Sequence, residues 1–395
     1  MFKIPKLGEL ISKNGILEKI SLLMWTVAVG AYFFQFPFSF LSSLILPALF
    51  AYIILQFPQL NILKDRKYTI LSVIYILFLG FLVFRGIFLH TQFTRILRFF
   101  VILAVIPFVF CVRDKNFHTK KNIFISFAAV KSIILIAFGA IIVCYGEFGF
   151  FRGWASSHGL GDIYFLNRFI PKIQVHGNAL LVVALMLDYM CTKKIKLKTV
   201  IILAGVLCAG NFAFMLALIA FVGWRFLIFG LDFTKKHPMA KQIIIVVGMF
   251  AAVCVMPYIS SKIQEKADVS NAIRIHQAMA LLKANPLVGD GLGNWVNFKS
   301  SLITYNGDIY FEMQTLYIFN QIGIIGLGLF YFITLKPAFA AGKDRFILYL
   351  IYIFFSFWNP YCFDTTQMFT IILLMNSAEL GEYNEKSAYY GLSAC

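Results

Sequence analysis

The chain has 395 residues, of which 60% carry hydrophobic side chains and 13% are charged, and its formal net charge is +17. A soluble domain of this size cannot bury so much apolar surface, so the composition excludes one and predicts a protein that crosses a membrane several times. The basic residues fall in short clusters between apolar stretches instead of on one face, which argues against a nucleic-acid partner.

Apolar stretches of roughly 20 residues, the length of a membrane-spanning helix, follow one another through the sequence. They predict an all-α polytopic fold that forms a single membrane domain over residues 1–395. The predicted spans are Ser21 to Phe36, Phe38 to Phe57, Thr69 to Leu89, Ile96 to Val112, Asn122 to Tyr145, Val175 to Met190, Lys198 to Gly230, Ile243 to Ser260, Met313 to Leu335, Phe346 to Trp358 and Thr366 to Asn376.

The stretch from Lys198 to Gly230 is too long for one span. Lysines precede and follow it, and the positive-inside rule requires both flanks to be cytoplasmic. A break at Ala209-Gly210-Asn211 into two short helices satisfies both flanks and gives about twelve spans. Both chain termini are then cytoplasmic. The two long loops, Gly146 to Gln174 and Ser260 to Glu312, lie on the opposite face, which is the periplasm in a bacterium.

Several positive charges fall on that periplasmic face, where the topology rule disfavours them. A guanidinium group holds phosphate oxygens in a bidentate geometry, so these cations are candidates for binding an anionic headgroup. The alternative is that each extends to lipid headgroups or pairs with an acid such as Asp162. The candidates are Arg98 at the outer end of the fourth span, Arg152, Arg168 and Lys172 in the first long loop, and Arg274 in the second.

Two candidates for proton transfer stand where the chain enters a span. His176 lies in Gln174-Val-His-Gly-Asn178, and Glu312 directly precedes Met313-Gln314. Partial burial would raise the pKa of a carboxyl group at the Glu312 position, which suits a general base. The alternative for Glu312 is an ordinary interfacial anion.

The large loop contains a predicted helix followed by a glycine-rich turn. Ser270 to Ala284 has helical spacing, with Ala272, Ile275, Met279 and Leu282 on one side and Arg274, Gln277 and Lys283 away from it. Asn285-Pro286 ends this helix. Gly289, Gly291 and Gly293 then allow a tight turn whose backbone N–H groups are predicted to converge on an anion.

Three stretches together resemble the signature of the O-antigen polymerase and ligase superfamily. They are Asn271-Ala-Ile-Arg274, Lys283-Ala-Asn-Pro-Leu-Val-Gly-Asp-Gly-Leu-Gly-Asn294 and Gln321-Ile-Gly-Ile-Ile-Gly-Leu327. In that family an arginine opens a helix, an "NP-L-x-G-x-G" turn follows, and a span beginning "x-x-G-I-I-G-L" returns to the membrane.

The resemblance implies a GT-C-like membrane fold and glycosyl transfer that needs neither a metal nor a cofactor. It places the catalytic cavity under the large periplasmic loop, where arginines hold a pyrophosphate leaving group. By position, Arg274 matches the motif arginine. His176-Gly-Asn178 resembles the family's Asn-containing start of the span after the first long loop, which makes Asn178 a candidate for substrate binding.

The chain departs from the family pattern at two places. The family commonly has His-Asn where this chain has Glu312-Met-Gln314, so Glu312 is the expected substitute for the base and Gln314 a candidate substrate contact. The family often has an arginine in a break between two short spans, where this chain has Gly210-Asn211-Phe212. Another cation, Arg168 or Lys172, is therefore expected to neutralise the phosphate.

The resulting hypothesis is an O-antigen polymerase of lipopolysaccharide biosynthesis in the bacterial inner membrane. It would join undecaprenyl-pyrophosphate-linked oligosaccharides with inversion, with Glu312 or His176 taking the proton from the acceptor hydroxyl. Membrane lipids, a chain-length regulator and a flippase are the expected partners. The alternatives are a ligase that transfers polysaccharide to lipid A core, and a flippase or other transporter. The missing His-Asn pair favours a polymerase over a ligase.

Transport is disfavoured because most charges gather at the outer rim instead of near the midplane. The exceptions are three charges within spans, each expected toward the cytoplasmic end of its span: Lys131, Asp188 and Arg225.

Overall fold

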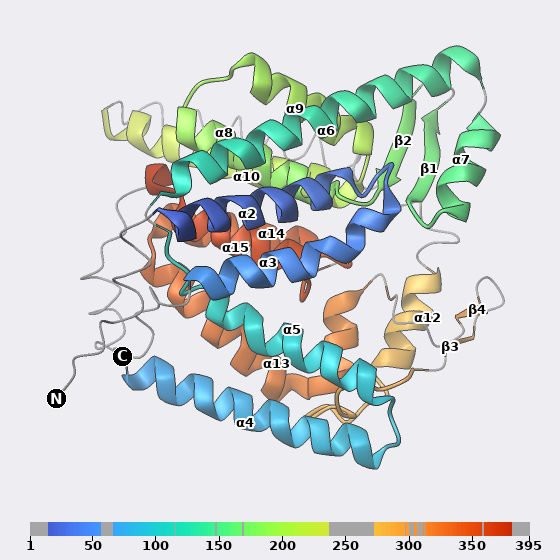
Figure 1. Ribbon diagram of the computed structural model, residues 1–395, viewed down its shortest axis with the longest axis vertical. Helices are drawn as coiled ribbons and strands as arrows, with labels where there is room; N and C mark the ends of the chain where they lie inside the picture. Colours follow the sequence, from blue (N-terminus) through green and yellow to red (C-terminus); the bar gives the residue numbers. More distant parts are fainter. Residues whose placement is uncertain are drawn as a thin grey trace.

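The computed structural model shows a bundle of helices that run along roughly one common direction (Figure 1). It describes residues 15–56, 66–114, 116–146, 148–167, 170–236, 272–296, 298–299, 304–305, 311, 313–357 and 359–380. The first half of the chain forms α2 (Ile16–Phe34), η1 (Ser39–Leu41), α3 (Ser42–Gln56), α4 (Arg66–Phe88), α5 (Phe93–Val109), α6 (Phe117–Tyr145), α7 (Phe148–Ser157), β1 (Gly161–Asn167), β2 (Ile170–Val175) and α8 (Ala179–Thr192). The second half forms α9 (Leu197–Ala209), α10 (Phe212–Lys236), α12 (Ala272–Leu281), β3 (Phe298–Lys299), β4 (Thr304–Tyr305), α13 (Gln314–Ala340), α14 (Lys343–Ser356), α15 (Thr365–Asn376) and η5 (Ala378–Leu380).

Every predicted span within the described residues overlaps a helix, although Val175 to Met190 begins in strand β2 and becomes helical only at Ala179; the predicted span Ile243 to Ser260 lies outside the described residues. By length and composition, 6 of the described helical stretches are able to cross a membrane: Ile16–Phe34, Ser39–Gln56, Tyr68–Phe88, Phe117–Tyr145, Phe212–Phe229 and Gln314–Ala340. The predicted membrane-embedded, mainly helical class is therefore supported.

The predicted break in the long apolar stretch is confirmed. Helix α9 ends at Ala209 and α10 begins at Phe212. Gly210 between them has a left-handed backbone with φ 59°, the conformation in which glycine commonly ends a helix. The lysine clusters on the two flanks thus located a real interruption.

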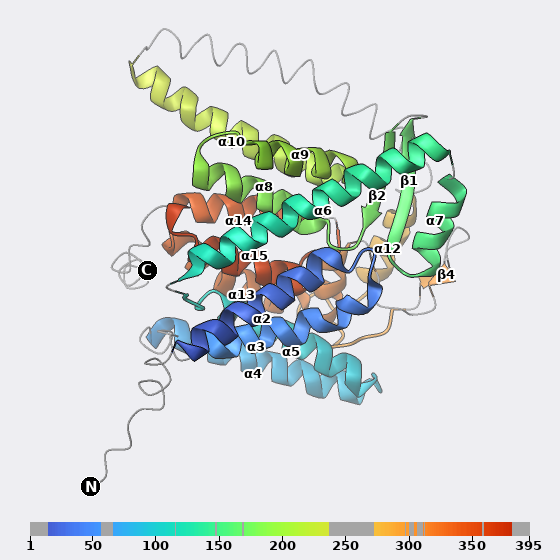
Figure 2. The same cartoon turned by 45° about the horizontal axis from the view of Figure 1, so that its top comes forward.

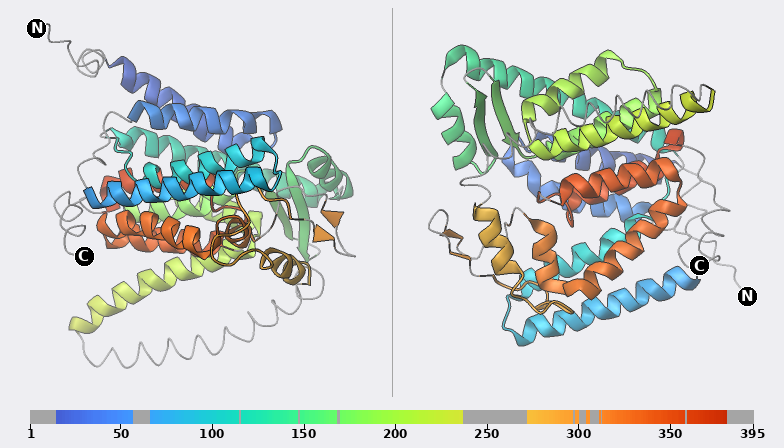
Figure 3. Two further views of the ribbon diagram at one scale, coloured as in Figure 1. Left: turned by 90° about the horizontal axis from the view of Figure 1, so that it is seen from below. Right: turned by 180° about the vertical axis from the view of Figure 1, so that it is seen from behind.

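The described parts of both long loops lie at the same end of the bundle, which we call the loop end (Figures 1 and 3). It carries α7 and the β1–β2 hairpin from the first loop, and α12 with the short β3–β4 hairpin from the second. The two loops had been predicted to share one face, and the structure brings their described parts together there.

The hairpins are a correction to the all-α prediction. Strands β1 and β2 pair antiparallel, with Ile163 opposite Ile173 and Tyr164 opposite Lys172. Ile163 and Ile173 are fully buried. Alternate residues of a strand face opposite sides, so the same register carries Lys172 away from that apolar face. This alternation is visible in the sequence but is short beside the helical spans.

The burial of α12 does not follow its amphipathic pattern. Gln277, expected away from the apolar side, is completely buried, whereas Lys283, expected on the same side, is exposed. Ile275, Met279 and Leu282 are instead more than half exposed. Exposed apolar side chains are common in a membrane protein because lipid, unlike water, does not force them inward.

An aromatic cluster holds the middle of the bundle together. Trp25 of α2 is fully buried, and its ring lies 5.0 Å from that of Tyr52, 5.4 Å from that of Phe117 and 5.6 Å from that of Phe369. Its indole N–H donates to the carbonyl of Lys120 at 2.9 Å. Because these contacts join α2, α3, α6 and α15, they set the relative positions of helices whose other ends form the loop end.

Candidate functional site

The glycine-rich turn of residues 285–294 is built into a break in α13. Within α13, Gly323 has φ 63° and ψ −174°, so the helical hydrogen bonds are interrupted there. The freed amides of Ile324 and Ile325 donate to the carbonyls of Pro286 and Leu287 at 2.9 and 3.1 Å. The turn therefore supplies the acceptors that the broken helix lacks, which an apolar environment requires.

Backbone N–H groups of the same turn also donate hydrogen bonds to the segment of α13 just before the break. The N–H groups of Asp290 and Gly291 donate to the carbonyls of Asn320 and Gln321 at 2.8 and 3.0 Å. The N–H of Gly293 donates to Gln321 Oε1 at 2.8 Å. These amides are already occupied by protein acceptors, so the predicted convergence of backbone N–H groups on an anion is wrong.

The glycines of the turn serve close packing against the ends of α4 and α5. A Cβ at Gly291 would lie 2.8 Å from the backbone nitrogen of Gly86, and one at Gly293 would lie 2.9 Å from that of Ile96. Beside this contact, the guanidinium carbon of Arg95 lies 3.8 Å from the ring centroid of Trp295. The turn thus fixes the start of α5, where Arg95 and Arg98 stand one helical turn apart.

Lys172 reaches the break between α9 and α10. A Cβ at Gly210 would lie 2.5 Å from Cγ of Lys172 and 2.9 Å from its Cβ, so the lysine stem lies directly over the glycine backbone. The break was the place where the family resemblance led us to expect an arginine. The structure therefore puts one of the two cations predicted to substitute for it beside the break.

The loop between α14 and α15 adjoins the same break. Asn211 Nδ2 donates to Asn359 Oδ1 at 3.4 Å, and the ring centroids of Phe214 and Tyr361 are 5.9 Å apart. Asp364 ends this loop. Its Oδ1 accepts from the N–H of Gln367 at 3.2 Å and so caps the first turn of α15.

Asp364 has the most unusual carboxyl group among the described loop residues. Burial raises its pKa to about 7, and the hydrogen bonds from Thr366 and Gln367 together with the charge of Arg98 act in the opposite direction. Thr366 donates to Asp364 Oδ2 at 2.9 Å, and its hydroxyl also lies 3.1 Å from the phenol oxygen of Tyr32. Arg98 also lies within electrostatic range of Tyr317 at the start of α13.

We call the set Arg98, Lys172, Asn211, Asn359 and Asp364 the loop-end site. Within this set Arg98 lies within electrostatic range of Asp364, whose pKa is about 7, and the stem of Lys172 lies over the adjoining α9–α10 break. Such a pairing suits a reaction in which an anionic group leaves while a hydroxyl loses its proton. Arg98 and Lys172 were predicted site residues. Asp364, Asn211 and Asn359 were not, because Asp364-Thr-Thr-Gln367 has the pattern of an ordinary helix cap.

Arg152 is held by an acid of its own loop. Its Nε lies 2.8 Å from Asp162 Oδ1 and its second terminal nitrogen 3.1 Å from Oδ2. Partial burial raises the pKa of Asp162, but hydrogen bonds from Arg152, Tyr164 and the Ile163 amide outweigh it and leave that pKa below its ordinary value. The structure thus realises the alternative of pairing with Asp162.

His176 lies in the connection between β2 and α8. Its Nε2 is 2.8 Å from the Gly159 carbonyl, so this nitrogen carries the proton and Nδ1 is the basic one. Lys131, fully buried, donates to the His176 carbonyl at 3.2 Å and to that of Phe36 at 3.4 Å.

These contacts correct one expectation about Lys131, which was predicted to lie toward the cytoplasmic end of its span. Its two acceptors belong to the end of α2 and to the β2–α8 connection, both at the loop end. Asn178, two residues after His176, is also buried, and its Nδ2 donates to the Ile173 carbonyl at 2.8 Å. Asn178 therefore acts in the described structure by holding β2 to the start of α8.

Two further predicted residues lie on α12 and α13. Gln314 begins α13, and its Oε1 is buried without a hydrogen-bond partner in the described part of the chain. Arg274 lies on α12, which packs against α13. Glu312 and Arg168 lie outside the described residues, so their predicted roles stay predictions.

The chain was compared with protein-family models, with curated proteins and with solved structures, and none of them matches.

Proposed function

We propose that the protein is a membrane glycosyltransferase that joins oligosaccharides carried on polyprenyl pyrophosphate, as an O-antigen polymerase does. In this proposal it has about twelve spans, sits in a bacterial inner membrane and presents the loop end to the periplasm. The proposal draws on the loop-end site, where Arg98 lies within electrostatic range of Asp364, a carboxyl group of pKa about 7, and the stem of Lys172 lies over the adjoining α9–α10 break. The presence of basic residues and this carboxyl group at the loop end is the main observation in support of the proposed glycosyl transfer.

The cations supply the electrostatic part of the reaction. When the anomeric C–O bond breaks, negative charge grows on the leaving pyrophosphate, and positive groups fixed in advance stabilise that charge. Arg98 and Lys172 come from separate elements, α5 and β2, which the turn of residues 285–294 and the α9–α10 break hold in place. Arg274 remains a candidate for the same role from α12.

The base is one of three residues. The acceptor hydroxyl must lose its proton as it attacks, and a base with a pKa near the working pH does this best. Asp364 meets this condition within the described structure, Glu312 is the base expected from the sequence resemblance, and His176 keeps Nδ1 for the task. Gln314 Oε1, buried without a partner among the described residues, is suited to accept a hydrogen bond from a sugar hydroxyl.

A ligase that transfers finished polysaccharide to lipid A core would use the same electrostatics, and it is the second candidate. The interlocked turn and broken α13 favour neither over the other. A transporter is less well supported, although α13 is discontinuous like some transporter helices. The amides freed by its break are bonded to the turn of residues 285–294 instead of lining a substrate path.

A product assay separates the three candidates. Purified protein in proteoliposomes receives a fluorescent oligosaccharide on polyprenyl pyrophosphate, with or without lipid A core. A ladder of repeat units without core supports the polymerase, a single product that requires core indicates the ligase, and movement of intact lipid-linked sugar across the bilayer indicates a transporter. The Arg152→Ala variant serves as a folded control that should retain the wild-type product.

A further inference from the structure

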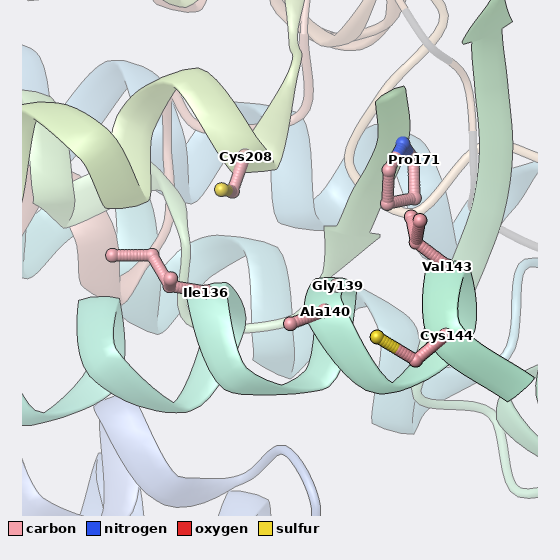
Figure 4. A pocket seen from close by; sticks show the side chains of 7 residues that line it. All are labelled: Ile136, Gly139, Ala140, Val143, Cys144, Pro171 and Cys208. Atoms are coloured by element: carbon pink, nitrogen blue, oxygen red, sulfur yellow. The ribbon is translucent and has the colours of Figure 1, made fainter. Parts of the chain in front are cut away.

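An apolar groove lies on the outside of the bundle beside the β1–β2 hairpin (Figure 4). Residues 136–144 of α6 form its floor, and Pro171 of β2 and Cys208 of α9 form its walls. The groove has a volume of about 330 Å³. This is near the lower limit of the roughly 300–1,000 Å³ typical of small-molecule sites. Its lining is apolar apart from the thiols of Cys144 and Cys208.

The groove opens away from the core. Ala140, Val143 and Cys144 are exposed, whereas Gly139 and Ile142 on the same helix are buried. A Cβ at Gly139 would touch Pro171 and Ile173 at 3.5 Å, so the strand crosses α6 there. Figure 2 shows α6 running beside α9 and β2 along this side of the molecule.

The direction of the groove matches a lipid whose headgroup is at the loop end. Helix α6 ends at the loop end with Tyr145, so the floor runs from Cys144 down to Ile136, about 12 Å deeper along the helix. The upper edge of the groove lies near a basic residue, Lys172. Pro171 precedes Lys172, and Cys208 lies two residues before Gly210, over whose backbone the Lys172 stem lies. The positive end of the α10 dipole starts at the same break.

We infer that this groove holds the polyprenyl chain of a lipid-linked saccharide whose pyrophosphate lies beside Lys172. The inference rests on the proposed function for the identity of the lipid. A single flexible hydrocarbon chain fits an open, mainly apolar groove on a membrane-facing surface, and each CH₂ group that it buries there adds to binding. Lys172, whose stem lies over Gly210 beyond the Cys208 wall, would favour an anionic headgroup over a neutral one.

The test uses a polyprenyl pyrophosphate with a photoreactive diazirine in its tail, added to protein in nanodiscs of phosphatidylethanolamine and phosphatidylglycerol. We expect crosslinks, mapped by mass spectrometry, within residues 136–144. Ala140→Trp fills the groove from an exposed position and should reduce labelling at least fivefold. Ile141→Trp, at an exposed position next to it that does not line the groove, should leave labelling unchanged.

Headgroup selection is measured with the same probe. Lys172→Ala should reduce labelling by the pyrophosphate at least fivefold and labelling by the neutral polyprenol less than twofold. Equal labelling by both probes in wild type, or labelling that falls as the share of phosphatidylglycerol in the nanodiscs is raised, would show a general lipid contact and overturn the inference. Crosslinks elsewhere in the chain, or equal effects of the two tryptophan variants, would overturn it too.

The chain's own segment 243–260, outside the described residues, is the other occupant to test. Cys254 lies in it, so a variant that keeps only Cys144 and Cys254 is treated with a short bismaleimide. Efficient joining would mean that this segment covers the groove and would refute the inference, whereas no joining supports it.

The two proposals can fail separately. Groove labelling without any polymer ladder would refute the proposed function alone, and a normal ladder in Ala140→Trp with labelling elsewhere would refute the groove alone.

Discussion

At the residue scale, Asp364 is distinguished by a pKa close to neutral pH, which suits a general base. Burial raises that pKa to about 7, so the fraction of ionised carboxylate grows as the pH rises through this value. If Asp364 is the base, the reaction rate should rise about tenfold per pH unit below about 7 and level off above it. Asp364→Asn should remove this dependence and most of the activity, yet still fold, because asparagine caps helices as well as aspartate does.

Arg98 provides an independent check on that assignment. Its charge lowers the pKa of Asp364, so Arg98→Ala should move the midpoint of the pH–rate profile to higher pH. The profile is measured with initial rates in proteoliposomes between pH 5 and 9, a range of about four units. If Glu312→Gln abolishes the ionisation and Asp364→Asn leaves it in place, the base is Glu312 instead.

The Arg152–Asp162 pair makes a contrasting prediction. It is exposed, with Arg152 at 47% and Asp162 at 32%, so Arg152→Ala should cost no more than about 1 kcal/mol of unfolding free energy. The pKa of Asp162 is depressed, so the pair's contribution is present above the ordinary aspartate pKa and lost as the pH falls through the lower folded value. Thermal unfolding in detergent at neutral and acid pH measures this contribution to the free energy of unfolding. A loss of several kcal/mol at neutral pH would contradict the prediction.

At the element scale, the structure depends on the junction between the turn of residues 285–294 and the break in α13. Gly323 adopts φ 63° and ψ −174°, a region essentially restricted to glycine, and a Cβ there would lie 2.3 Å from the Leu287 carbonyl oxygen. Gly323→Ala should therefore cost about 3 kcal/mol or more. Gly328→Ala, in the same helix with nothing within 4 Å of its Cβ, should be neutral or slightly stabilising. Equal melting temperatures for the two variants would refute this account of the junction.

The break between α9 and α10 affects binding more than folding. Gly210→Ala places a methyl group 2.5 Å from Cγ of Lys172, a flexible side chain that can move aside. We expect a several-fold higher KM for the lipid-linked sugar with a modest loss of stability, because the lysine is displaced and φ 59° disfavours alanine. Gly223→Ala, in open space on α10, is the matched control for both readouts.

The elements differ in how far the sequence could specify them. The α9–α10 break was predicted correctly because charge on both flanks of one apolar stretch allows only an even number of crossings. The sequence did not specify which face of α12 packs against protein, because hydrophobic periodicity identifies an apolar face without saying whether protein or lipid covers it. The prediction that the turn of residues 285–294 binds an anion was wrong for another reason. Glycine spacing signals a tight turn, but whether its amides meet an anion or the broken α13 depends on residues about 30 positions later.

The candidate site shows the same limit. Lys172 and Arg98 could be selected as candidates from the sequence because the positive-inside rule disfavours positive charge on the outer face. Asp364 was not, since its sequence neighbourhood matches a helix cap, a role that it does fill. Only the fold brings it within range of Arg98 from α5, more than 260 residues earlier in the chain.

At the scale of the whole molecule, the proposal requires the loop end to face the periplasm. Alkaline phosphatase, which is active only after export, should be active when inserted after Asn167 in the first long loop and inactive when inserted after Lys194 in the α8–α9 connection. The first insertion lies at the loop end and the second at the opposite end of the bundle. Activity at both sites or at neither, with both fusions expressed, would refute the topology.

The central claim is that the loop-end site binds the pyrophosphate of a lipid-linked sugar during transfer. The most direct test is the initial rate of repeat-unit joining in proteoliposomes for wild type, Arg98→Ala, Lys172→Ala and Arg152→Ala. Removing one fixed group that stabilises developing charge typically costs about 10²–10³ in rate. We predict losses of this order for the first two variants and less than a threefold change for Arg152→Ala, whose partner is Asp162. Equal rates in all four proteins, or a large loss confined to Arg152→Ala, would contradict the account.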